Sequence, residues 1–241
     1  MATSELKDVS DAVHRLIVHD IRAHVSPSVC ADPNTFRQDC CYRADVCREL
    51  ERHEASLRLV FACVAKADGR TGIQEKLVAY DEWIAFLRAL GFVGTDLTDR
   101  DARLAFVWSR MCVIDNRSEL SYLRDNQLPF EGFIEAICRV AALKALPTDA
   151  EISDAGCSHA GSFLKHLSSS DPAAYELFLQ ERRAPWGELP SVQPIARCVA
   201  HTLALLISTI EIQTRGSDNL RLTEKEVSDW MRAAILTTVQ L

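Results

Sequence analysis

The sequence predicts an all-α protein, and three observations support this prediction. Apolar residues recur at steps of three and four along most of the chain, which is the spacing of one face of a helix. The strict alternation of apolar and polar residues that is typical of half-buried strands is almost absent. A pattern of helix, loop and helix also repeats with an offset of 50 residues. We therefore expect repeated pairs of helices.

The composition fits a folded protein and limits the partners that it can bind. Of 241 residues, 48% are hydrophobic and 25% are charged, which is enough material for one large core or two small ones. The formal net charge of −7 disfavours nucleic acid, because binding to phosphate backbones needs clustered Lys and Arg side chains. We expect no nucleic-acid partner.

The terminal and the most apolar segments indicate the compartment. Residues 1–11 are polar and acidic and lack the basic flank and apolar run of a secretory signal, so we expect a cytoplasmic protein. The nine cysteines are then expected to be reduced thiols. The segment 195–212 contains Arg197, His201 and Glu211, which predicts a buried core helix rather than a membrane span.

Two amphipathic helices are expected in the first third of the chain. Their apolar positions, with one polar interruption in the second helix, are Leu6, Val9, Val13, Leu16 or Ile17, and Ile21 in the first, and Cys47, Leu50, Leu57, Phe61 and Val64 in the second. Two prolines interrupt the chain between these helices, and Asn34 or Thr35 is expected to cap the helix that follows.

Residues typical of helix ends occur in the middle of the chain. Gly91 follows an apolar helical segment, where a left-handed cap is expected. Thr98 precedes an acidic first turn, which suits the positive end of a helix dipole. Pro147 is expected to end the helix that contains "FIEAICRVAALKAL".

Further helix starts are expected in the last third. The connection that leads to residue 195 is rich in Ser, Pro and Asp and contains one short helix, which Asp171 caps and which has Pro172 at its first position. Thr223 and Glu226 have the spacing of a capping box at the start of the last helix.

The repeated unit consists of a helix, a loop and a second helix. "LVAYDEWIAFLRAL" from residue 77 aligns with "QLPFEGFIEAICRV" from residue 127, and "LRLTEKEVSDWM" from residue 220 is a weaker third copy. Val78, Leu128 and Leu222 occupy the same position, the eighth of the loop. This unit resembles the EF-hand, in which two loops pair through a short strand contact at that position.

The resemblance covers residues 50–146 and, more weakly, 195–237. It implies degenerate EF-hand-like helix pairs in two calmodulin-like lobes. We expect one domain at 1–147, with the N-terminal helices and the first EF-hand-like pair, and a second at 148–241, with a linker and a C-terminal helical lobe.

The predicted loops lack most calcium ligands. An EF-hand holds calcium with oxygen atoms from loop positions 1, 3, 5, 7, 9 and 12. Positions 1, 3, 5 and 12 are Thr71, Ile73, Glu75 and Glu82 in the first loop, Ser121, Leu123, Asp125 and Gly132 in the second, and Arg215, Ser217, Asn219 and Glu226 in the third. We expect no metal; the best weak calcium candidate is Ser217, Asn219 and Glu226. A calcium sensor with at most one working site is the alternative.

The chain contains no recognisable signature of an enzyme. A Gly-rich phosphate loop is absent, as are the GxSxG, HExxH and kinase patterns. Cys40, Cys41, Cys47 and His53 lack the CxxC spacing of structural zinc sites. We expect a non-enzymatic protein without a cofactor. A cytosolic enzyme remains a further alternative, because a cysteine and a histidine could still meet in the fold.

Two features favour recognition of another protein. A helix pair without metal is expected to stay in one arrangement and to bind a partner constitutively, in a groove lined by large side chains. Among the aromatic residues of the repeats, we name Phe92 and Trp108 as partner-binding candidates. The segment 166–194 contains a serine run and "RRAPWG", and it is either a linker lying over a neighbour or a connector between lobes.

Three pieces of sequence are similar to a known group of proteins. "FRQDCCYRADVCRELERHEASLRLVF", "AFVWSRMCVID" and "LPFEGFIEAICRVA", within residues 36–142, resemble the helical, degenerate EF-hand-like proteins of flagellated eukaryotes that are often associated with cilia. Gly132 departs from the acidic residue usual after "PFE". The resemblance implies a structural component of a cilium or flagellum that binds axonemal or microtubule-associated proteins.

Overall fold

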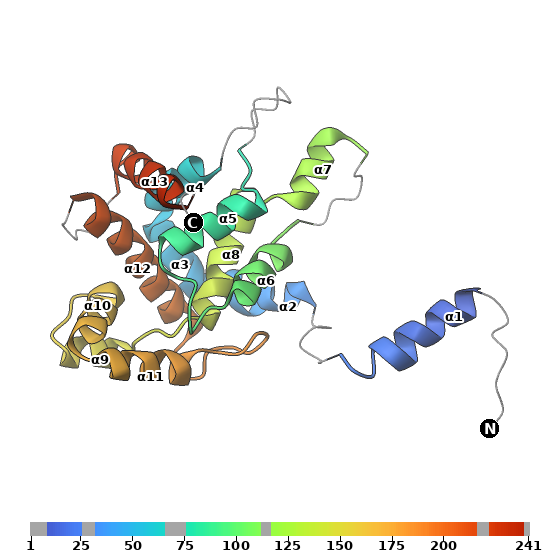
Figure 1. Cartoon of the computed structure of the whole chain (residues 1–241), viewed down its shortest axis with the longest axis horizontal. Coiled ribbons are helices and arrows are strands. Elements are labelled where there is room, and N and C mark those ends of the chain that lie inside the picture. Colours follow the sequence, from blue (N-terminus) through green and yellow to red (C-terminus); the bar gives the residue numbers. More distant parts are fainter. Residues whose placement is uncertain (1–8, 26–31, 66–75, 112–116, 216–221, 239–241) are drawn as a thin grey trace.

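The computed structural model describes residues 9–25, 32–65, 76–111, 117–215 and 222–238, and these ranges are mainly helical (Figure 1). The predicted all-α class is confirmed. Within the described ranges, the β-type pairing is limited to one antiparallel bridge between Val78 and Leu128.

The helices are distributed over the whole length of the chain. The first third contains α1 (Val9–Arg15), the π-helix η1 (Leu16–Ile21) that continues it, α2 (Pro33–Phe36), the π-helix η3 (Arg37–Cys41), α3 (Ala44–Arg52) and α4 (Glu54–Val64). The middle contains α5 (Tyr80–Ala89), α6 (Asp99–Trp108), α7 (Glu119–Asn126) and α8 (Phe130–Leu143). The last part contains α9 (Asp149–Asp154), α10 (Ala160–Ser170), α11 (Pro172–Arg182), α12 (Ile195–Arg215) and α13 (Glu224–Thr238).

Helices α8 and α12 form the centre of the helical body. α12 packs against α3, α8, α10 and α13, and α8 also contacts α4 and α6. α13 lies against α4 and α5, while α9, α10 and α11 gather at one end of α12 (Figure 1). Every side chain from Ala136 to Leu143 of α8 is consequently buried.

The apolar helix α12 lies in this core. By length and composition, it is the one helix among the described residues that could cross a membrane, and 72% of its most apolar window is buried inside the fold. Two of its polar residues also lie in the core: Glu211 is fully buried, and His201 is 5% exposed.

Several predicted helix ends are confirmed. Gly91 has a φ of 68°, the left-handed conformation expected after α5. The side chain of Thr98 accepts a hydrogen bond from the backbone N–H of Asp101 and caps α6. Asp171 caps α11 in the same way, and Pro172 occupies the first position of that helix. The prediction of one short helix in the connection up to residue 195 is wrong, because α9 and α10 lie there as well as α11.

The predicted cap at Asn34 or Thr35 is wrong. The helix begins at Pro33, and the cap is the preceding Asp32, whose side chain accepts the N–H of Asn34 at 2.9 Å. The predicted helix through Cys47 and Val64 is also divided, because the chain leaves helical geometry at His53, between α3 and α4.

Helix α8 ends earlier than Pro147 predicts. It stops at Leu143 because a buried contact holds the next residues in another conformation. Lys144 Nζ lies 2.9 Å from a carboxylate oxygen of Asp96, and the same oxygen accepts the backbone N–H of Ala145 at 3.0 Å. Tertiary contact therefore overrides the local signal.

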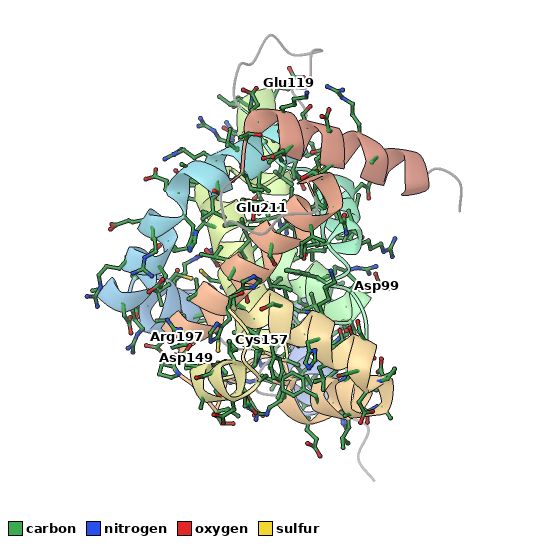
Figure 2. The ribbon with its side chains drawn as sticks, turned by 90° about the vertical axis from the view of Figure 1, so that its left-hand side faces the viewer. Asp99, Glu119, Asp149, Cys157, Arg197 and Glu211 are labelled. Atoms are coloured by element: carbon green, nitrogen blue, oxygen red, sulfur yellow. The ribbon has the colours of Figure 1, made fainter. Side chains whose placement is uncertain are left out.

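The predicted domain boundary after residue 147 falls between α8 and α9. Buried side chains on both sides of it belong to one hydrophobic cluster that extends from Cys40 to Met231. An ion pair between Asp149 of α9 and Arg197 of α12 lies just beyond the boundary (Figure 2). The described residues thus share a core, and the division into two lobes stays a prediction.

Candidate functional site

The first predicted calcium loop ends in a carboxylate that caps its own helix. Glu82 Oε2 accepts the backbone N–H of Ala79 at 3.0 Å, at the start of α5. Thr71, Ile73 and Glu75 lie outside the described residues. The one acidic residue of this loop at position 12 therefore has a structural role.

The second predicted loop contains a helix in place of a ligand cage. Ser121, Leu123 and Asp125 all lie in α7, which Ser118 caps through the backbone N–H of Ser121. On an α-helix, residues two apart point about 200° away from one another. Leu123 therefore points away from Ser121 and Asp125, which share a face of α7, and these two side chains alone cannot supply the six to eight oxygens of a calcium site.

Gly132 has a packing role. A Cβ atom added to it would lie 2.8 Å from the backbone oxygen of Ser109, at the C-terminal end of α6. A real Cβ atom does not approach that closely, so a side chain at this position would push α8 away from α6. Glycine takes the place of an acidic residue at this position because α6 and α8 approach each other closely there.

The third predicted loop is described only at its end. Ser217 and Asn219 lie outside the described residues, whereas Glu226 belongs to α13. Its carboxylate accepts the backbone N–H of Thr223 at 2.8 Å, as the predicted capping pair requires. Among the residues that the structure describes, no group of three or more His, Cys, Asp or Glu side chains could hold a metal ion.

An apolar cavity of about 290 Å³ opens beside α6 and α8, and we call it the aromatic pocket. Trp108 and Trp186 lie in its wall with their ring centroids 5.9 Å apart at 69°, an edge-to-face arrangement. Both rings are half-buried. The remaining large side chains that line the pocket are Phe36, Arg139, Leu143 and Leu189.

Backbone contacts hold the two tryptophans in place. Arg37, next to Phe36, donates hydrogen bonds to the backbone oxygens of Trp108 and Arg110, which fixes the end of α6. The backbone N–H of Ala184 donates to the carbonyl of Leu143 at 3.1 Å, which fixes the segment before Trp186 against the end of α8. The chain's own hydrogen bonds therefore hold the walls of the pocket in place.

The buried cation in the wall of the pocket is ion-paired within the protein. Arg139 is 4% exposed and donates to one oxygen of Glu135, at 2.7 and 3.0 Å, while Arg37 donates to the other oxygen at 2.8 Å. The Arg139 guanidinium also lies 4.3 Å from the centroid of the Phe36 ring. The two guanidinium groups share one carboxylate, so this ion-paired cluster keeps one net positive charge beside the aromatic and aliphatic walls of the pocket.

The pocket has an acidic rim and an unreactive thiol. Asp32, Asp39 and Glu188 line it and are exposed. Burial, followed by the neighbouring Cys41 and Asp39, raises the pKa of the Cys40 thiol to about 12, so this thiol stays protonated near neutral pH. The rim is therefore acidic, and the Cys40 thiol is not poised as a nucleophile.

The two partner-binding candidates named from sequence do not lie together. Trp108 lines the aromatic pocket, whereas Phe92 is 3% exposed and packs in the core with Lys144 Nζ 4.9 Å from its ring centroid. Phe92 reaches the wall of a different cavity, of about 280 Å³, beside α10 and α12.

The comparisons with known proteins identify no relative of this chain. Protein-family models, curated proteins and solved structures yielded no match to it. The function of the site must therefore follow from its own contacts. Sequence reasoning singled out Trp108 and the segment with Trp186 separately, and it missed Phe36 and Arg139. The "RRAPWG" sequence was the signal for Trp186, but nothing local paired it with Trp108.

Proposed function

We propose that this protein is a non-enzymatic structural adaptor that binds another protein constitutively, without calcium. The observation that carries the proposal is the preformed aromatic pocket, whose buried charge is already paired and whose open walls are apolar. A surface of this kind suits a protein segment with large apolar side chains.

We further propose that α4–α5 and α6–α8 form a degenerate EF-hand-like pair. The antiparallel bridge supports this proposal, because Val78 and Leu128 are the residues at the eighth loop position and each donates its N–H to the carbonyl of the other. The structural roles of Glu82 and Gly132 agree with a unit that no longer depends on metal. A permanently fixed pair suits an adaptor better than a switch.

The setting that we propose is a cilium or flagellum, with an axonemal or microtubule-associated partner. The support is the resemblance of three pieces within residues 36–142 to degenerate EF-hand-like proteins of flagellated eukaryotes. The acidic rim of the pocket adds that the partner segment is positively charged.

Calorimetry tests calcium independence. Titration of calcium into the full chain is expected to give no saturable heat in the micromolar range, for the wild type and for Glu226→Ala alike. A micromolar binding heat that Glu226→Ala abolishes would support the alternative of a calcium sensor. The substitution itself removes a helix cap, so the folded state of the variant is checked by circular dichroism.

Proximity labelling in ciliated cells tests the adaptor role. The wild-type chain is expected to label a reproducible set of axonemal proteins. Trp108→Asp, which places a charge in the pocket wall, should lose part of that set, whereas Tyr122→Asp should keep it, because Tyr122 is 60% exposed on α7 and does not line the pocket. Identical labelling by wild type and Trp108→Asp would contradict a role for the pocket.

A further inference from the structure

The N-terminal helix presents an apolar surface that its own chain does not cover. α1 and η1 form one helical segment, Val9–Ile21, that stands clear of the helical body (Figure 1). No side chain in this segment is buried. The residues that we call the apolar stripe are 48% to 80% exposed, namely Val9, Val13, Leu16, Ile17 and Ile21.

Such a segment needs a partner surface to be stable. An isolated helix of fewer than about 12–15 residues is marginal in water, because the cost of forming its first turn is offset only by a few hydrogen bonds. Five large apolar side chains on one helix also exceed the scattered exposure that is usual for a protein surface. The apolar stripe is therefore expected to dock onto a partner surface.

The aromatic pocket lies where the N-terminal segment joins the body. Asp32, the last residue before α2, lines the pocket. Residues 22–32 connect the end of η1 to the pocket. At most about 3.6 Å per residue, this connection reaches farther than the length of the helical segment, about 20 Å. The segment can therefore extend to a second copy of the chain.

The charges of the two surfaces are complementary. The rim of the pocket carries Asp32, Asp39 and Glu188. The part of the N-terminal segment nearest the body, with the residues that follow it (14–24), carries two Arg and three His against Asp20, whereas Asp11 lies in the first turn of α1 at the other end of the helix. A segment of this composition is attracted to the acidic rim.

We propose that two copies of the chain form a dimer in which the apolar stripe of each copy docks into the aromatic pocket of the other. The docking rests on the proposed protein-binding role of the pocket: the stripe of the second copy fills the pocket until a segment of the axonemal partner displaces it. A second copy covers both open surfaces at once, whereas a membrane would cover only the stripe and a foreign helix only the pocket. The symmetric exchange is closed, so no stripe or pocket is left to continue into a filament.

The size of the pocket and of the segment agrees with this arrangement. A cavity of about 290 Å³ is close to the lower limit of ligand pockets, about 300 Å³, and suits a few anchoring side chains such as Leu16 and Ile17. One short helix covers little area, and two reciprocal dockings bury twice that area in one complex. The dimer is stabilised by the anchoring side chains and by the second, reciprocal docking.

Sedimentation velocity of the full chain tests the proposal. The wild type is expected to be a dimer at micromolar concentration. Ile17→Asp in the stripe and Leu189→Asp in the pocket each place a charge in the proposed contact and should raise the dimer dissociation constant by more than about tenfold. Both residues are half-exposed, so the fold should persist. Tyr122→Asp, an equally exposed position outside both surfaces, should remain dimeric.

Mixing the two variants makes the test specific. Ile17→Asp and Leu189→Asp chains together retain one intact stripe and one intact pocket in a mixed pair, so heterodimers should form more readily than either homodimer. A monomeric wild type would overturn the proposal, as would a dimer that Ile17→Asp breaks and Leu189→Asp leaves intact, since that result indicates direct pairing of two stripes. A monomeric wild type together with Trp108-dependent labelling of axonemal proteins would overturn the dimer alone and leave the adaptor function standing.

Discussion

Val78 and Leu128 exchange both of their backbone hydrogen bonds, with N–O distances of 2.8 and 2.9 Å. Both side chains are fully buried. This reciprocal pair joins the segment before α5 to the segment before α8 and sets the position from which each helix starts. Gly132, four residues after Leu128, is thereby brought against the end of α6.

We predict that Gly132→Ala destabilises the protein. The added Cβ atom would lie 2.8 Å from the Ser109 backbone oxygen, and relieving that overlap by helix displacement should cost about 1–3 kcal/mol in the free energy of unfolding. Urea unfolding measures the change. Gly94→Ala is the control, because a Cβ atom there meets nothing within 4 Å, and it should be neutral or slightly stabilising. Equal stability of both variants would contradict the packing role of Gly132.

The repeat made part of this arrangement predictable. Aligning two copies at an offset of 50 placed Val78 over Leu128, and these residues are the ones that pair. Gly91 and Asp171 were predictable for the same kind of reason, since each acts through its nearest neighbours along the chain.

Features that depend on tertiary contact were not predictable. α7 (Glu119–Asn126) covers the first half of the second predicted loop, where the alignment predicted ligand positions and no helix. The aromatic pocket joins Phe36, Trp108 and Trp186 from three distant parts of the chain, and no periodicity links them. The early end of α8 at Leu143 follows from a buried charge on another loop. Sequence patterns predict local geometry but not these contacts between residues that are distant in the chain.

We predict that breaking the buried ion pair between Asp96 and Lys144 strongly lowers the free energy of unfolding. Asp96 and Lys144 are 5% and 8% exposed, and Asp96→Ala would leave the ammonium group without its carboxylate and the Ala145 N–H without its acceptor. Loss of one partner from a buried pair costs about 3–5 kcal/mol. Asp99→Ala is the control, since its pair with Arg88 is exposed and should contribute less than about 1 kcal/mol. Thermal and urea unfolding compare the two; similar losses would contradict the argument.

We predict that the core thiols resist alkylation in the native protein. Burial raises the pKa of Cys198 to about 11, and a hydrogen bond with Cys41 together with burial raises the pKa of Cys138. Because the thiolate is the reactive form, iodoacetamide near pH 8 should modify these two residues only after denaturation. Peptide mass spectrometry follows each site, with Cys157 near the end of α9, which is half-buried, as the internal reference. Native modification of Cys198 as fast as Cys157 would contradict the prediction.

The environment of His201 links stability to pH. The imidazole is buried in α12 beside Arg197, and Arg197 is itself paired with Asp149 (Figure 2). Burial, followed by the charge of Arg197, lowers the pKa of His201, although Asp149 and Glu49 oppose the shift. Asp149 lies 3.4 Å from His201 Nε2, but it is largely exposed and already bound to Arg197. The folded state therefore holds a neutral imidazole.

We predict that the free energy of unfolding decreases as the pH falls through about 6.5, the ordinary pKa of histidine. The pKa of His201 is lower in the folded than in the unfolded state, so above that range neither state is protonated, whereas below it the unfolded state takes up the proton first and is favoured. Urea unfolding between pH 7.5 and 5 measures the slope. His201→Gln should reduce the slope without abolishing it, because burial also lowers the pKa of His53. His166→Gln, at an exposed histidine of α10, controls for the substitution, and an unchanged slope in His201→Gln would exclude His201 as its source.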